Sequence, residues 1–187
     1  MVRAVGAQKA EEAANKLLDE YLITKPPIDP VDLARQEGLV VVYERLPGDT
    51  SSVLLREASG RRFIGINSRH ADTRRRFSTA HELGHALLHF DSSPPATTEA
   101  VVSRPLEVLF RDGLAGQGTD KVEIDANVFA ACLLMPAQFL RPAFRRAIET
   151  HGTRSLSRVV ERLAADFTVS EQALRYRLIN LNLIDPA

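Results

Sequence analysis

The spacing of apolar residues predicts two helices at the start of the chain. Alanine, leucine and tyrosine side chains recur at helical intervals from about Gln8 to Tyr21, and the prolines within residues 24–30 prevent that helix from continuing. The segment 29–39, with the sequence DPVDLARQEGL, predicts a second, short helix that ends near Gly38. A proline-rich turn therefore separates two N-terminal helices.

Three strand-like runs follow these helices. They are rich in β-branched and apolar residues and occupy residues 39–46, 51–58 and 61–68. Ser59 and Gly60 separate the last two runs and are typical of a tight turn between antiparallel strands. We therefore expect a hairpin from these two runs and, together with the first run, a small antiparallel sheet.

The remainder of the chain has a helical pattern. One apolar helix is predicted from about residue 73 to 90, with Asp72 or Thr73 as its N-cap, and another from about residue 120 to 135. Further helices are predicted at 137–150, 154–166 and 170–181. A domain boundary near Pro136 would divide the chain into 1–136 and 137–187, although both parts also fit one continuous domain.

The composition narrows the function classes. The 187 residues include 24 basic and 24 acidic side chains, so the formal net charge is zero and any nucleic-acid binding needs a local basic patch. The start lacks the apolar core of a signal peptide, and no run is long enough to span a membrane. With Cys132 as its single cysteine, the chain has no intrachain disulfide. These features predict a cytoplasmic protein without a membrane partner.

The predicted helix at 73–90 contains HELGH at residues 81–85. His81 and His85 are four residues apart, so both imidazoles project from one helix face and can reach one zinc ion. Glu82 lies about 100° around the helix, where it can contact a water held by the metal without binding the metal. Because unpaired polar groups are costly on an apolar helix, this spacing favours two metal ligands and a general base over chance.

A catalytic zinc site needs a third protein ligand and an open position. His89 is four residues beyond His85, but a row of three histidines would be more than about 10 Å long, so His89 better fits a capping residue, a supporting residue or a polar surface position. Glu123 and Asp125 precede an apolar helical run, and Asn127 shares a helix face with Glu123. Spacing alone leaves Glu123, Asp125 and His89 as competitors, because Glu123 also fits a helix-capping box.

The segments RRRFSTAHELGHALLH and EIDANVFAACLLMP, in this order, resemble the ImmA/IrrE family of bacterial metallo-endopeptidases. The resemblance covers most of the chain, from PPIDPVDLARQEGL through FIGINS to LAADFTVSEQALRYRL. The second segment fits the family pattern E-x-x-A-N-x-F-A-A-x-L-L-M-P at every fixed position. Two motifs in the right order are far more specific than the two histidines alone.

The resemblance breaks the tie over the third ligand. It implies that Glu123, the first residue of the second motif, joins the two histidines of HELGH in a gluzincin-like site. Asp125 falls at a variable position, and His89 is common in the family without being a ligand. His89 and Asn127 then remain as supporting residues behind the metal ligands.

The resemblance also implies a fold and an activity. The fold is α+β, with a small antiparallel sheet packed on the active-site helix and an all-helical C-terminal region that here includes a helix-turn-helix-like element. The activity is that of a zinc-dependent, or manganese-dependent, endopeptidase in which Glu82 is the general base. Family members cleave helix-turn-helix repressors of the phage type, which relieves repression of a mobile element or a stress response. A co-encoded repressor is therefore the expected partner.

Two other functions compete with this interpretation. The helices around 154–181 resemble a helix-turn-helix, and Arg175 and Arg177 could face a nucleic acid, which would make the protein a DNA-binding regulator. We favour a helical packing module, because this geometry is common without DNA. The second competing function is that of a toxin–antitoxin component with a metallopeptidase fold.

The run Arg74–Arg76 could guide an acidic substrate or simply be solvated at a helix start.

Overall fold

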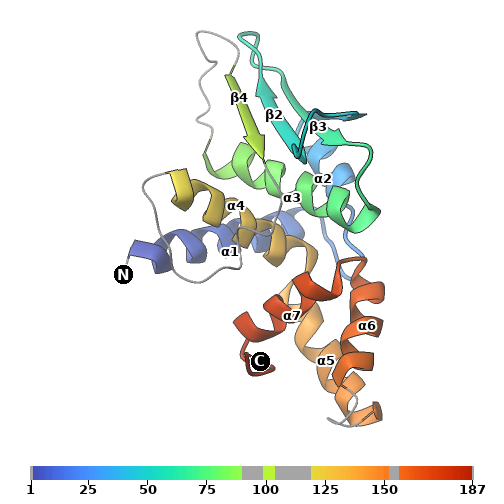
Figure 1. Cartoon of the computed structure of the whole chain (residues 1–187). Coiled ribbons are helices and arrows are strands. Elements are labelled where there is room, and N and C mark those ends of the chain that lie inside the picture. Colours follow the sequence, from blue (N-terminus) through green and yellow to red (C-terminus); the bar gives the residue numbers. More distant parts are fainter. Residues whose placement is uncertain (1, 90–98, 104–118, 152–155, 187) are drawn as a thin grey trace.

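The structure is a computed structural model that describes residues 2–89, 99–103, 119–151 and 156–186. Its elements in chain order are α1 (Val2–Glu20), α2 (Pro30–Gln36), β1 (Leu39–Glu44), β2 (Ser52–Arg56), β3 (Arg62–Asn67), α3 (Asp72–Leu88), β4 (Glu99–Ser103), α4 (Thr119–Leu134), α5 (Ala137–His151), α6 (Leu156–Phe167) and α7 (Glu171–Asn180). Figure 1 shows the sheet at the top, α3 below it, α4 and α1 below α3, and α5–α7 at the bottom. The α+β fold class is confirmed.

The described sheet has four strands in the order β1-β3-β2-β4. β2 and β3 form the predicted antiparallel hairpin, in which Arg56 pairs with Arg62 across the turn that contains Gly60. β4 pairs antiparallel with β2 and forms an edge of the described sheet. The prediction of an all-antiparallel sheet is wrong for β1, which runs parallel to β3.

The physical reason lies in the position of β1. The segment 45–51 carries the chain past β3, so β1 and β2 are neighbours in sequence but β3 lies between them in the sheet. The apolar pattern places Leu39 and Val41 on the buried face, where they are 2% and 8% exposed. That pattern specifies which face of a strand is buried but not which strand lies beside it.

The start of α3 also differs from the prediction. Its N-cap is Ala71, which makes no side-chain capping hydrogen bond, and Asp72 is the first helical residue. The Asp72 carboxylate accepts a hydrogen bond from Arg75 at 3.2 Å, one turn further along the helix. A negative charge in the first turn is still favourable, because it interacts with the helix dipole there.

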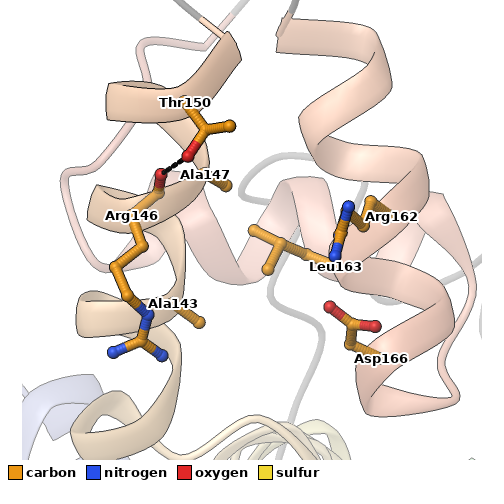
Figure 2. Close-up of a pocket in the computed structure, with 7 residues that line it drawn as sticks. All are labelled: Ala143, Arg146, Ala147, Thr150, Arg162, Leu163 and Asp166. Atoms are coloured by element: carbon orange, nitrogen blue, oxygen red, sulfur yellow. Dashed lines mark hydrogen bonds between the residues drawn. The ribbon is translucent and has the colours of Figure 1, made fainter.

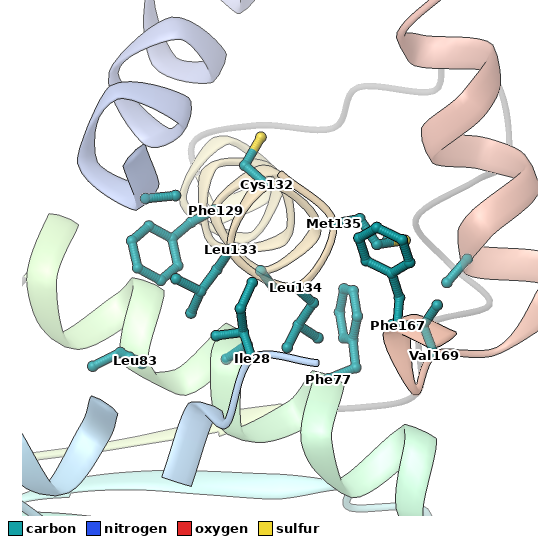
Figure 3. Packing of buried hydrophobic residues seen from close by; sticks show 14 of the residues in the cluster. Ile28, Phe77, Leu83, Phe129, Cys132, Leu133, Leu134, Met135, Phe167 and Val169 are labelled. Atoms are coloured by element: carbon teal, nitrogen blue, oxygen red, sulfur yellow. The ribbon is translucent and has the colours of Figure 1, made fainter. Parts of the chain in front are cut away.

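α3 is buried between the sheet and α4. Figure 3 shows α4 end-on, with Phe129, Leu133 and Leu134 pointing toward α3, whereas Cys132 points away from it. The two helices approach closely at Gly84, because a Cβ there would lie only 3.0 Å from the Phe129 ring and 3.2 Å from the backbone of α4. The glycine between the two histidines of HELGH therefore allows α4 to lie against the motif.

Cys132 is a core residue, as its apolar surroundings predict. It is 1% exposed, and this burial is the main reason why the pKa of its thiol is raised to about 11. A thiol with such a pKa stays protonated near neutral pH and is a poor metal ligand or nucleophile.

The arginines at the start of α3 make contacts within the protein. Arg74 donates a hydrogen bond to the Ser51 hydroxyl at 2.9 Å, and Arg75 pairs with Asp72. Arg76 donates to the carbonyls of Ile28 and Thr168, so it joins the segment before α2 to the turn between α6 and α7. These contacts argue for a structural role of the arginine run rather than substrate guidance.

The turn between α6 and α7 has the predicted helix-turn-helix form, and Ser170 caps α7 by accepting a hydrogen bond from the amide of Ala173. The suggestion that Arg177 faces a nucleic acid is wrong. Arg177 is 6% exposed and donates to the Met135 carbonyl at 3.1 Å and to Glu11 at 3.4 Å. It therefore connects α7 to the end of α4 and to α1.

Replacing Arg177 by alanine is expected to lower the free energy of unfolding by about 1.5–3 kcal/mol, because a buried carbonyl loses its charged donor. Replacing the neighbouring Arg175 by alanine is expected to change it by less than about 0.5 kcal/mol. Urea denaturation of both variants measures the difference. Equal and small effects would contradict the structural role of Arg177.

The hydrophobic core contains residues from both sides of Pro136. The domain boundary near that residue stays a prediction.

Among the described residues, no single helix has both the length and the apolar character needed to cross a membrane. The helical segments 121–134 and 137–150 meet the criteria of length and composition only when they are taken together. They are bent by 56° relative to each other.

Candidate metal centre

α3 supplies three buried polar side chains to one place. His81, Glu82 and His85 are 6%, 0% and 1% exposed. The Nε2 atoms of the two histidines face each other at 3.0 Å, as expected for residues one helical turn apart. Their rings are nearly perpendicular, with an interplanar angle of 81°. The helix thus directs two nitrogen donors at one point.

α4 brings a carboxylate to the same point. One oxygen of Glu123 lies 3.2 Å from His85 Nε2, and the other lies 3.3 Å from His81 Nε2. Ligand atoms of all three residues lie within 4.8 Å of one another. A tetrahedral zinc ion with bonds of about 2.0–2.1 Å needs ligand atoms roughly 3.3–3.4 Å apart. The observed spacing therefore fits a zinc-sized ion.

Asn127 lies directly behind His81. Its side-chain amide donates to the backbone carbonyl of Glu123, and its oxygen Oδ1 lies 2.8 Å from His81 Nδ1. Because that oxygen can only accept, His81 Nδ1 must carry the hydrogen, which leaves the Nε2 lone pair free for a metal. Asn127 thus has the position expected of a supporting residue.

His89 is outside the ligand group. It is the C-cap residue of α3, and its backbone amide donates to the His85 carbonyl at 3.0 Å. Its Nδ1 lies 3.2 Å from His85 Nδ1, on the side of His85 away from Glu123. Asp125 approaches His89 Nε2 at 3.8 Å. Neither His89 nor Asp125 is brought to the point where His81, His85 and Glu123 meet.

The electrostatics of the group favour a positive charge. Burial alone would raise the pKa of Glu123, but the neighbouring His81 and His85 rings outweigh it and hold this pKa well below its usual value. Burial alone would lower the pKa of His81, but Glu123 and Glu82 outweigh it and the pKa is raised. A carboxylate kept ionised between two imidazole rings forms, together with their nitrogens, a donor set suited to a cation.

Glu82 is held by a residue that sequence reasoning missed. The hydroxyl of Ser52 on β2 donates to Glu82 Oε1 at 2.6 Å, and Ser52 itself is 1% exposed. The second oxygen, Oε2, is buried and has no hydrogen-bond partner among the described residues. The sign of this contact in the sequence is a serine at an inward-facing position of an apolar strand. One oxygen of Glu82 is thus fixed, and the other has no hydrogen-bond partner in the described part of the chain.

A pocket of about 210 Å³ lies elsewhere, between α5 and α6 (Figure 2). Arg146, Arg162 and Asp166 line it together with small and apolar side chains. None of its lining residues belongs to α3 or α4, which carry the metal-ligand candidates. The candidate metal ligands therefore lie outside this pocket.

Comparison with known proteins supports the resemblance. The family described as the IrrE N-terminal-like domain matches residues 34–179. The "Uncharacterized immunity region protein 2" of Bacillus phage phi105 is 39% identical over 75 residues, which are 40% of this chain and 39% of that protein. The structure of a Mycobacterium tuberculosis transcriptional regulator aligns with a TM-score of 0.60 and 18% identity over 92% of this chain and 46% of its own. The latter likeness shows a shared fold, and the chain spans less than half of either protein.

Proposed function

The chain belongs to the Peptidase_M78 family, and we propose that it is a metal-dependent endopeptidase whose ion is held by His81, His85 and Glu123. The observation that carries the proposal is the convergence of two imidazole nitrogens and a carboxylate at the spacing of a tetrahedral site. Two histidines and a glutamate are a common ligand set of catalytic zinc. Zinc is therefore the first choice, with manganese as the second.

A bound ion supplies Lewis acidity, which polarises the scissile carbonyl and activates water near neutral pH. Glu82 takes the proton of the attacking water on Oε2, because Ser52 occupies Oε1. The same carboxyl then gives this proton to the leaving amine. Ser52 keeps the carboxylate in one orientation, which the proton transfer requires.

An extended substrate needs a strand edge close to Glu82. The parallel pairing of β1 puts β3 between that strand and β2, which carries Ser52. Ser52 pairs instead with Ser103 of β4, whose other edge has no partner strand among the described residues. We expect the peptide to add to the β4 edge, because backbone hydrogen bonds there would align it beside the catalytic carboxylate.

The proposed substrate is a helix-turn-helix repressor of the phage type. A relative whose name places it in the immunity region of a phage supports a regulatory substrate over general protein digestion. Cleavage in such a repressor would relieve the repression that it exerts. The buried Arg177 weighs against the alternative that α7 itself reads DNA.

The test uses a repressor encoded beside this protein. We expect the repressor to be cut at a defined bond when zinc or manganese is present, and to stay intact in EDTA. Mass spectrometry of the fragments locates the bond. An intact repressor under all metal conditions would contradict the proposed substrate, and a salt-dependent DNA shift by this protein would favour the regulator alternative.

A further inference from the structure

The two proposed histidine ligands have different partners on their outer nitrogens. His81 Nδ1 contacts Asn127 Oδ1 at 2.8 Å, on the helix that also carries Glu123. His85 Nδ1 contacts His89 Nδ1 at 3.2 Å, within α3. An amide oxygen is always an acceptor, but an imidazole nitrogen can donate or accept. The orientation of His85 therefore depends on which ring nitrogen of His89 carries the hydrogen.

The hydrogen positions follow from a chain of contacts. If His85 keeps the Nε2 lone pair for a metal, its Nδ1 carries the hydrogen and donates to His89 Nδ1. The hydrogen of a neutral His89 must then lie on Nε2. This nitrogen is buried and faces the Asp125 carboxylate at 3.8 Å, without a hydrogen-bond partner among the described residues. The negative charge of Asp125 favours this arrangement at that distance.

Asp125 is in turn confined by the N-terminal helix. A Cβ at Gly6 of α1 would lie 3.0 Å from the carboxylate carbon of Asp125 and closer still to Oδ1. Any side chain at residue 6 must therefore displace the carboxylate. Glycine is otherwise less favourable than alanine inside a helix. The absence of a side chain at this position leaves room for Asp125.

We propose that Asp125, accommodated by Gly6, acts through His89 to position His85 for metal binding. The inference rests on the proposed function, because it presumes that His85 is a ligand. Asp125 and His89 are positioning residues, and α1 becomes part of the metal centre without contacting the ion. Loss of such supporting groups typically weakens metal binding by about 10–100-fold.

The experiment measures the zinc dissociation constant of the full chain by competition with a chromophoric chelator. Asp125→Asn keeps the shape of the side chain but removes its charge, and Gly6→Ala crowds it. Both variants are expected to bind zinc at least about 10-fold more weakly. Asn15→Ala, on the exposed face of α1, is the matched control, because it also raises helix propensity and should leave zinc affinity unchanged.

The double variant Gly6→Ala/Asp125→Asn separates positioning from general damage. If Gly6 acts through Asp125, the double variant should bind zinc about as tightly as Asp125→Asn alone, whereas independent effects would multiply. Unchanged affinity in both single variants, or multiplied losses in the double variant, would overturn the inference. An unaltered chain that binds no zinc would instead overturn the proposed function and this inference with it.

Discussion

Replacing Glu82 by glutamine is expected to lower kcat for peptide cleavage by about 10²–10⁴-fold, the usual contribution of a general base. Glutamine has nearly the same shape, so the Ser52 hydroxyl can still donate to the oxygen that replaces Oε1. The group at the position of Oε2 then belongs to an amide, which cannot accept the proton as a carboxylate does. Zinc binding should stay within a few-fold, because Glu82 is outside the ligand group.

The kinetic measurement needs the zinc content of each sample, so that lost activity is not confused with lost metal. Glu161→Gln is a matched control, because it makes the same chemical change at an exposed position of α6. This control should keep full activity. Retained cleavage by Glu82→Gln at full zinc occupancy would remove Glu82 from the role of base.

Replacing Glu123 by alanine is expected to weaken zinc binding by more than the roughly 10–100-fold that follows loss of a supporting group. The reason is that only the two imidazoles of α3 would remain, and two ligands do not complete the usual catalytic set. Equilibrium competition with a chelator measures the dissociation constant. Peptide cleavage at limiting zinc should fall in parallel.

The neighbouring residue Val122 provides the control for this change. It is 36% exposed on the same helix, so Val122→Ala tests whether trimming the start of α4 alone affects the site. Its zinc affinity should match that of the unaltered chain. Unchanged zinc affinity in Glu123→Ala would assign the third ligand to Asp125 or His89.

The candidate site was predictable where local helix geometry determines it. The spacing of His81 and His85 places both nitrogens together on one helix, and the i, i+4 spacing of Glu123 and Asn127 places the amide behind the ligands. The choice among Glu123, Asp125 and His89 was not predictable from spacing, because it depends on how α4 lies across α3. The family resemblance supplied that information, and the functional roles themselves stay predictions.

Other parts depend on tertiary packing that no local pattern encodes. The parallel pairing of β1 results from the path of the chain around β3. The contact of Ser52 with Glu82 joins residues 30 positions apart, and that of Arg177 with Glu11 joins residues 166 apart. A buried arginine in a helix-turn-helix pattern has the same appearance in sequence as one that faces DNA, so only its contacts distinguish the two.

α4 joins the metal centre to the helical end of the molecule. Glu123 lies near its start, while the carbonyl that Arg177 binds belongs to Met135, directly after its end. An ion that binds the folded chain and not the unfolded chain would stabilise the fold that contains both ends. A ligand at 100 times its Kd adds about 2.7 kcal/mol to stability, which for a chain of this size raises Tm by roughly 5–10 °C. The melting temperature would then serve as a titration curve for an added ion, readable without any substrate.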